Sequence, residues 1–343
     1  MSSTPCPHCG QTHPEGATFC PNTGKPIPRS MPSPSTIFSR SFVIGIVGLV
    51  VILTIGIGSF VGGVFFAPRF MVTPTAETPK PTATPTLGIG SSQVSSKDGM
   101  TLMYVPAGTF TMGSSADDAL RECQKFKNDC QRSWLIREEP AHQVTLNAFW
   151  IDKTEVTNKM YALCVASGAC PLPQSSQSAT RKNYYGNTQY NNYPVIHVSW
   201  QNANAYCRWT GRRLPTEAEW EKAARGTDSR IYPWGNTTPD ANKLNFNHDI
   251  GDTTEVGSYP SGASPYGVMD MAGNVWEWVN DWYEETYYSK SPAQNPTGPV
   301  SGTDRAFRGT GYGNDSGVRA SGRGGDVPRL VNWDLGFRCA FSQ

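Results

Sequence analysis

The segment Gly267-Val-Met-Asp-Met-Ala-Gly-Asn-Val-Trp-Glu-Trp278 combines turn-forming residues, carboxylates and indole rings in one short stretch. Gly273 and Asn274 favour a tight turn, because both tolerate backbone conformations that other residues avoid. The two tryptophans that follow flank Glu277 in the alternating pattern of a half-buried strand. We therefore expect a turn that leads into a strand near the centre of the fold.

The two carboxylates of this stretch, Asp270 and Glu277, predict a cation site. A carboxylate buried between indole rings must be ion-paired, hydrogen-bonded or bound to a metal, because an unpaired buried charge is costly. Carboxylates combined with turn carbonyls suit a hard cation, and calcium is favoured because it accepts backbone oxygens and irregular geometry. The alternative is an ordinary tryptophan-rich turn of the core.

The composition predicts a globular, loop-rich protein that does not bind nucleic acid. With 343 residues, of which 38% are hydrophobic, the chain can form one large or two ordinary domains with a real core. Its 34 glycines, 27 prolines and 10 tryptophans favour a loop-rich fold packed around indole rings over a helical bundle. The net charge of +1 provides no excess of basic residues for a polyanionic partner.

Residues 1–25 resemble a zinc ribbon that lacks one ligand. A C-x-x-C knuckle is followed by a single thiol, and Thr23 stands where a fourth cysteine is expected. Two complete knuckles would supply the four thiolates of a tetrahedral zinc site. The segment therefore either binds zinc with a histidine as its fourth ligand or is a reduced, partly disordered leader. The candidate zinc ligands are Cys6, Cys9 and Cys20, completed by His8 or His13.

Residues 42–67 predict a single transmembrane helix. They carry no charged side chain, and at ~1.5 Å per residue such a helix reaches about 39 Å, enough to cross a ~30 Å hydrocarbon core with tilt. Residues 26–41 form a linker before the helix, and residues 68–97 form a stiff Pro/Thr-rich linker after it. Basic residues on the amino side favour a cytoplasmic N-terminus, and hence a single-pass protein of the cell membrane.

The six cysteines after the predicted helix indicate three disulfide bonds and an extracytoplasmic domain. Their number is even, and two pairs lie close enough in sequence for local bridges. A third bridge would tie the central helical region to the last strand. Disulfides form in oxidising compartments, and the alternative is six buried free thiols in a cytosolic fold. The predicted bridges are Cys123–Cys130, Cys164–Cys170 and Cys207–Cys339.

Helix signals cluster in the middle of this region. Residues 144–151 alternate as one strand, and Thr154-Glu-Val-Thr-Asn158 then opens a helix. Ser199 can cap a second helix, and the capping box Thr216-Glu-Ala-Glu219 opens a third helix that Gly226 ends. After Gly226 we expect mostly short strands and turns. The domain therefore mixes helices with strands.

Seven short motifs follow one another along the chain after residue 98. They are Gly108-Thr-Phe-Thr-Met-Gly113, Glu155-Val-Thr-Asn158, Pro194-Val-Ile-His-Val-Ser-Trp200, Gly211-Arg-Arg-Leu-Pro-Thr-Glu-Ala-Glu-Trp-Glu221, Trp234-Gly-Asn236, Gly273-Asn-Val-Trp-Glu-Trp278 and Gly336-Phe-Arg338. In this order they resemble the formylglycine-generating enzyme, or sulfatase-modifying factor, family over residues 98–343. The resemblance implies that family's fold: a complex, loop-rich α+β domain related to C-type lectins and stabilised by calcium.

The resemblance also implies which residues bind calcium. One site coincides with the cation site that the residue types already indicate, and a second site is aligned only with a gap. The ligands of the first site would be Asp270, the carbonyls of Gly273 and Val275, and Glu277. The ligands of the second site would be Asn245, Phe246, Asp249 and Gly251.

The copper site of the family's oxidases is missing from this sequence. The resemblance implies that those enzymes hold Cu(I) with two thiolates that follow an R-G-G-S-aromatic segment, since soft thiolates select Cu(I). This chain has Arg308-Gly-Thr-Gly-Tyr312, after which the expected thiolates fall at Asn314 and Arg319. No cysteine lies between Cys207 and Cys339. Copper is therefore not expected.

The retained motifs and the missing thiolates together predict a non-catalytic binding module. Its ligand would be a protein, peptide or glycan, held by a charged, glycine-rich groove. The alternative for this region is a solvated loop face with internal ion pairs. Another hypothesis is a formylglycine-generating or other protein-modifying oxidoreductase with an unrecognised site, and a third is ligand binding outside the cell reported to the ribbon inside. The predicted groove residues are Arg308, Tyr312, Asn314, Arg319 and Arg323.

Overall fold

The computed structural model describes residues 87–313 and 318–342, which belong to one compact unit, Lys80–Gln343. Within these described residues, every helix is too short or too polar to cross a membrane. Several predictions lie outside the described residues. They are the zinc ribbon at 1–25, the linker at 26–41, the transmembrane helix at 42–67, most of the linker at 68–97 and the groove residue Asn314.

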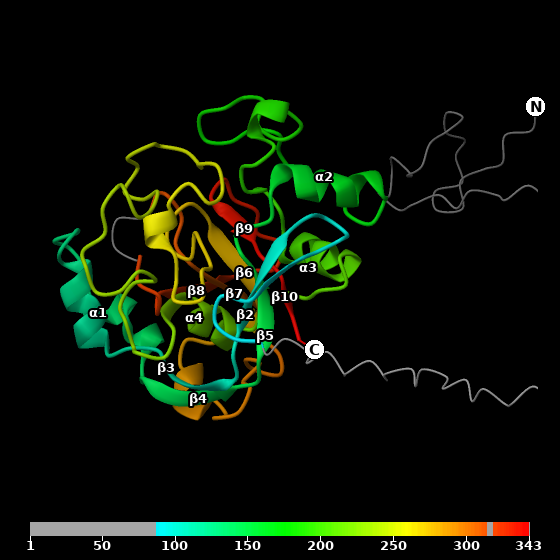
Figure 1. The fold of residues 1–343 in the computed structure, drawn as a ribbon. Coiled ribbons are helices and arrows are strands. Elements are labelled where there is room, and N and C mark those ends of the chain that lie inside the picture. Colours follow the sequence, from blue (N-terminus) through cyan, green and yellow to red (C-terminus); the bar gives the residue numbers. More distant parts are fainter. Residues whose placement is uncertain (1–86, 314–317, 343) are drawn as a thin grey trace, which may run out of the picture. The chain divides into compact units, whose positions relative to one another are not determined.

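The first sheet joins the two ends of the folded domain. Its strand order is β1-β2-β5-β10, and each neighbouring pair is antiparallel. Strands from the start and the end of the domain therefore lie side by side, as Figure 1 shows for β2, β5 and β10. The strands are β1 (Ser92–Val94), β2 (Thr101–Val105), β5 (Phe149–Asp152) and β10 (Ala340–Phe341).

The second sheet is built around the strand predicted from the tryptophan-rich segment. Its order is β8-β7-β6-β9, with β6 parallel to β9 and antiparallel to β7. Gly273 and Asn274 have φ angles of 80° and 60°, so the predicted turn into β6 is confirmed. In the register between β6 and β7, Glu277 lies opposite Arg308. The strands are β6 (Trp276–Trp282), β7 (Arg305–Arg308), β8 (Arg323–Asp326) and β9 (Leu335–Phe337).

The prediction of one strand over residues 144–151 is wrong, because the chain changes sheets within it. Residues 142–146 form β4, which pairs with β3 in a two-stranded sheet, and β5 begins at Phe149. At the break, the Asn147 N–H donates to the side chain of Asn295 instead of to a strand. The two-stranded sheet consists of β3 (Gly108–Met112) and β4 (His142–Leu146).

The helices begin where short polar side chains cap them. Ser199 accepts from the Asn202 N–H, and Thr216 and Glu219 form the predicted capping box, so both starts are confirmed. The helices are α1 (Ala116–Cys123), α2 (Asn158–Ala166), α3 (Trp200–Trp209) and α4 (Glu217–Arg225). Helix α4 ends at Gly226, which has a φ of 71°. Helix α2 starts only at Asn158, because Thr157 is its cap. The 3₁₀ helices are η1 (Arg132–Trp134), η2 (Ile136–Glu138), η3 (Thr188–Tyr190), η4 (Pro260–Gly262) and η5 (Tyr287–Lys290).

Helix α4 lies at the centre of the domain, and every one of its residues is buried. It packs against β3, β6 and β7, and Trp220 is fully enclosed in the larger hydrophobic core. Figure 1 shows α4 behind the meeting point of the sheets. A second core lies between α2, α3 and β9, where the rings of Tyr161 and Tyr206 stack. Charged residues of α4 are thus carried into the interior of the protein.

All three predicted disulfides are confirmed. Two of them close local loops, at the end of α1 and at the end of α2. The third joins α3 to the segment between β9 and β10 across 132 residues, so it links the middle of the domain to its last strand. The bonds are Cys123–Cys130, Cys164–Cys170 and Cys207–Cys339.

Candidate functional site

The carboxylate of Glu277, between Trp276 and Trp278 of β6, is buried and ion-paired. Arg338 donates to both of its oxygens, from Nε to Oε2 and from Nη2 to Oε1, each at 2.7 Å. The indole Nε1 of Trp220 also donates to Oε2, at 2.8 Å. Of the partners that the sequence allowed for this carboxylate, the structure provides an arginine and an indole.

Asp270, the other predicted carboxylate, lies beside a carboxylate that sequence reasoning missed. Its Oδ2 accepts from the Gly257 N–H at 2.6 Å. Glu155 is its neighbour, and the Asn274 amide donates to one Glu155 oxygen at 3.0 Å. Burial raises the pKa of both Glu155 and Asp270. The charge of Asp270 raises the pKa of Glu155 further, whereas the hydrogen bond between the two side chains opposes the rise at Asp270. Glu155 opens the motif Glu155-Val-Thr-Asn158, which was the available signal.

The structure brings the first set of predicted calcium ligands together on one turn and strand, but its charge is already matched. Both Glu277 oxygens accept from Arg338, so this carboxylate does not require a metal to remain buried. No group of three or more His, Cys, Asp or Glu side chains suited to a metal occurs among residues 87–313 and 318–342. Calcium at Asp270, Gly273, Val275 and Glu277 stays a prediction.

The second set of predicted calcium ligands divides between the interior and the surface. Asn245 is buried, and its Oδ1 accepts no hydrogen bond from a described residue, which fits a cation ligand. Phe246 is buried as well, whereas Asp249 is exposed. The buried carboxylate nearby is Asp252, which accepts from Ser178 and Thr180 and pairs with Arg181. This set, with Gly251 as its fourth member, also stays a prediction.

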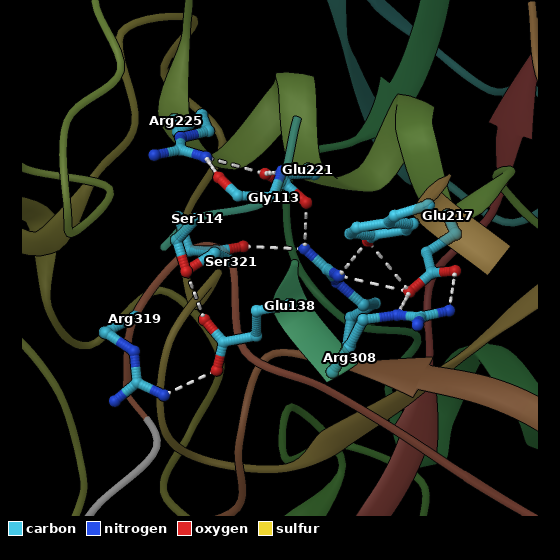
Figure 2. A network of polar contacts seen from close by, with 12 residues as sticks. Gly113, Ser114, Glu138, Glu217, Glu221, Arg225, Arg308, Arg319 and Ser321 are labelled. Carbon is cyan, nitrogen blue, oxygen red and sulfur yellow. Dashed lines mark hydrogen bonds and ion pairs between the residues drawn. The ribbon is translucent and has the colours of Figure 1, made fainter. Parts of the chain in front are cut away.

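Two of the predicted groove arginines are buried against α4. Figure 2 shows Arg308 reaching both Glu217 and Glu221. Its Nη1 lies 3.1 Å from Glu217 Oε1, and its Nη2 lies 2.6 Å from Glu221 Oε2. Arg323 donates to both Glu217 oxygens, at 2.6 and 2.9 Å. We call these four residues, Arg308, Arg323, Glu217 and Glu221, the arginine network.

Charge matching keeps the carboxylate of Glu217 ionised. Burial alone would raise the pKa of Glu217, but the guanidiniums of Arg323 and Arg308 outweigh burial and hold the pKa below its usual range. The other oxygen of Glu221 accepts from Arg225 and from the Gly113 N–H, each at 2.8 Å. The buried face of α4 is therefore held to β7 and β8 by ion pairs and hydrogen bonds.

A third groove arginine, Arg319, forms a separate buried ion pair (Figure 2). Its Nη2 donates to Glu138 Oε1 at 2.6 Å, and the hydroxyls of Ser114 and Ser321 donate to Glu138 Oε2 at 2.9 and 2.7 Å. Burial opposes ionisation of Glu138, but Arg319 and these hydroxyls outweigh it and lower the pKa. Arg319 is the residue at which the family resemblance places the second copper thiolate.

Among the described residues, two of the predicted groove residues, Arg319 and Arg323, line two different cavities. The first has a volume of about 430 Å³ and lies beside the Arg319–Glu138 pair, with Thr111, Ser114, Ser115, Ser229 and Ser321 among its lining residues. The second has about 330 Å³ and is lined by Arg323, Asp326, Trp276, Phe307 and Asp334. Arg308 is 0% exposed and lines neither of these cavities. Tyr312 is also buried and lines neither.

The chain belongs to the family of the sulfatase-modifying factor enzyme 1-like domain, which matches residues 90–343. It is 37% identical to the formylglycine-generating enzyme of Streptomyces coelicolor over 257 residues, covering 59% of this chain and 81% of that one. It is 31% identical to the inactive C-alpha-formylglycine-generating enzyme 2 of Mus musculus over 287 residues, covering 70% of this chain and 85% of that one.

Among solved structures, PvdO from Pseudomonas aeruginosa resembles this domain with a TM-score of 0.60 and 25% identity, covering 75% of this chain and all of that one. These likenesses agree with the mixed α and β fold described above. The family assignment that the seven motifs predicted is thereby confirmed.

Proposed function

We propose that this domain is a non-catalytic binding module within a family that contains oxidases. The observation that carries the proposal is the buried Arg319–Glu138 ion pair at the position where the family resemblance expects a copper thiolate. A guanidinium at that position repels a cation, and Cu(I) prefers thiolate ligands, which this part of the sequence lacks. The relative from Mus musculus that carries the name inactive supports a family role without oxidation.

We place the ligand in the first cavity. A volume of about 430 Å³ lies within the range of small-ligand pockets, and the wall is rich in hydroxyl groups that can both donate and accept hydrogen bonds. Two guanidiniums of the wall, those of Arg225 and Arg319, already pair with Glu221 and Glu138. A polar, uncharged ligand surface such as a glycan or a peptide backbone suits this lining better than a polyanion does.

We also propose that the chain is anchored in a membrane through residues 42–67, with the domain on the extracytoplasmic side. The uncharged apolar run supports the anchor, and the three disulfides support an oxidising compartment. Alkaline carbonate washing of membranes from cells that make the full chain tests the anchor. The chain should stay with the membranes and should be released when residues 42–67 are deleted. Release of the full chain would exclude the anchor.

The catalytic alternative is tested with the full chain, Cu(I), oxygen and a Cys-x-Pro-x-Arg peptide, followed by mass spectrometry. The Streptomyces coelicolor relative serves as the active control. We expect the control to convert the peptide cysteine to formylglycine and this chain to leave it unchanged. Conversion by this chain would refute the non-catalytic proposal and show that the copper site does not need the thiolate pair.

The binding proposal is tested by blocking the mouth of the first cavity. Ala141 is exposed and lines this cavity, so Ala141→Trp should fill it with little effect on folding. Ala169 is equally exposed and does not line it, which makes Ala169→Trp a matched control. Both variants and the unaltered full chain are applied to glycan and peptide arrays. Signals that disappear only with Ala141→Trp support the proposal, and identical signals from all three proteins contradict it.

A further inference from the structure

We propose that the second cavity is a separate binding site for a small organic cation, such as a quaternary ammonium or a guanidinium group. Its two aromatic walls are Trp276 on β6 and Phe307 on β7, both half-buried. Their ring centroids are 5.0 Å apart and the ring planes meet at 72°. Rings at a wide angle can attract one cation with both π systems, as aromatic cages do. We call Trp276, Phe307, Asp326 and Asp334 the aromatic corner.

Other aromatic groups of this domain already hold a cation of the protein itself. Arg305 lies between Trp200 and Trp282, with its guanidinium carbon 3.8 and 3.5 Å from the two ring centroids. Arg181 lies 5.0 and 5.1 Å from the centroids of two tyrosine rings, Tyr190 and Tyr193. No arginine or lysine of the described residues occupies such a position over the rings of the aromatic corner. The corner therefore offers π surface that the fold leaves unused.

The charge around the corner favours a cation. Asp334 is only 8% exposed, and its Oδ1 accepts no hydrogen bond from any described residue. Burial raises its pKa to about 6, although its own backbone N–H and His248 oppose the rise, so at neutral pH it is an ionised carboxylate that forms no ion pair with an arginine or lysine of the described residues. Asp326, a second carboxylate of the lining, accepts the neighbouring Val327 N–H and forms no ion pair among the described residues. Both carboxylates gain from an external cation.

The two arginines that line the same cavity do not cancel this preference. The guanidinium of Arg323 is already neutralised by both oxygens of Glu217. Arg137 lines the outer wall, and its Nε donates to the Trp134 carbonyl at 2.6 Å. Two carboxylates thus face one arginine that has no acidic partner among the described residues. The remaining charge of the cavity is negative.

A glycine on the edge strand β8 keeps the corner open. A Cβ built on Gly324 would lie 2.5 Å from Cε2 of Phe307, closer than real contacts allow. The ring of Phe307 therefore lies close to the backbone of β8, and any side chain at position 324 would displace the ring or the strand. An apolar wall and two carboxylate residues around a volume of about 330 Å³ are the composition of a small-ligand site.

The experiment is calorimetric titration of the full chain, at low salt and pH 7.5, with tetramethylammonium chloride and with methylguanidinium chloride. Sodium chloride at the same concentration is the reference. We expect saturable binding of at least one organic cation and none of sodium. The variants Trp276→Leu and Asp334→Asn should each weaken binding about tenfold. Tyr190→Leu is the matched control, because that ring faces the protein's own Arg181, and it should leave the affinity unchanged.

The outcomes are separable. Tighter binding of tetramethylammonium identifies the ligand as a methylated ammonium, and tighter binding of methylguanidinium identifies it as an arginine-like group. Absence of saturable binding, or an unchanged affinity in Asp334→Asn, overturns the proposal. Because asparagine has the shape of aspartate, this variant decides the question even if Trp276→Leu fails to fold. The Ala141→Trp variant of the first cavity should bind the cation normally, so the two proposals can fail independently.

Discussion

The arginine network and the aromatic corner both use residues of β7 and β8 but treat charge in opposite ways. In the network, Arg308 and Arg323 are buried, and Glu217 and Glu221 match their charges. In the corner, Asp334 is buried without a partner for one oxygen, and the aromatic walls hold no cation of the described residues. Matched charges hold elements of the fold together, whereas incomplete pairing leaves interaction energy for a ligand. The number of arginines in a region therefore does not show whether its charges stabilise the fold or are available to a ligand.

The largest expected effect comes from breaking the network. Glu217→Gln keeps the shape of the side chain but removes the charge that Arg308 and Arg323 share. The loss of one partner from a buried ion pair should lower the free energy of unfolding by about 3–5 kcal/mol. Urea unfolding of the full chain measures it. Glu285→Gln is the control, because this carboxylate is exposed, and it should change stability by no more than about 0.5 kcal/mol. Equal losses would mean that the network does not stabilise the fold.

A second test asks whether Arg319 is held as firmly as the arginine network. Arg319→Met should cost about 3–4 kcal/mol, because it leaves the carboxylate of Glu138 buried beside hydroxyls alone. Glu138→Gln in the same chain should recover most of that loss, since the uncompensated charge disappears. The double-mutant cycle is read from urea unfolding. If the two losses simply add, the Arg319–Glu138 pair is not energetically coupled.

The third prediction compares the pH dependence of the two regions. The pKa of Glu217 is lowered in the folded state, so its stabilisation is present above the ordinary range and is lost as pH falls. The pKa of Asp334 is raised from 3.8 to about 6, so its contribution has the opposite sign. It is present below pH 4 and is lost as pH rises through about 6.

The stability of Asp334→Asn relative to the unaltered chain should therefore be higher at pH 7 than at pH 4, by at most about 3 kcal/mol. Urea unfolding at both pH values measures the difference. His248 and Tyr312 are the titratable groups that face this carboxylate. The same comparison in a His248→Asn background controls for the histidine. A difference that does not change with pH would mean that folding does not raise the pKa of Asp334.

Local signals in the sequence were sufficient for the elements that depend on neighbouring residues. The turn at Gly273 depends on backbone preference, and the capping box at Thr216 depends on side chains three residues apart. The disulfides follow from the even number and spacing of the cysteines. The break after β4 was missed, because residues 144–151 keep one alternating pattern although their hydrogen-bond partners lie on different strands.

The partners of the groove arginines could not be predicted, because tertiary packing decides them. In the sequence, Glu217 looks like an acidic residue of an exposed first helical turn, where it interacts favourably with the helix dipole, and Glu221 follows one turn later. Only the placement of α4 against β7 and β8 turns both carboxylates toward Arg308 and Arg323. The alternative, a solvated loop face with internal ion pairs, therefore agrees with the observed ion pairs of these arginines but not with their burial. The carboxylate of Glu138 lies 181 residues from its arginine, beyond any local pattern.

The smallest expected effect separates an aromatic group that holds a cation from one that does not. Trp282 and Trp276 are both half-buried, but only Trp282 faces a guanidinium, at 3.5 Å from Arg305. Leucine at either position loses similar packing, so the difference between Trp282→Leu and Trp276→Leu isolates the cation–π contact. We expect Trp282→Leu to be the less stable variant by about 1 kcal/mol in urea unfolding without added ligand. Tetramethylammonium should then stabilise the unaltered chain and Trp282→Leu, but not Trp276→Leu, since binding to the folded state alone raises its stability. Equal stabilisation of all three would place the cation outside the aromatic corner.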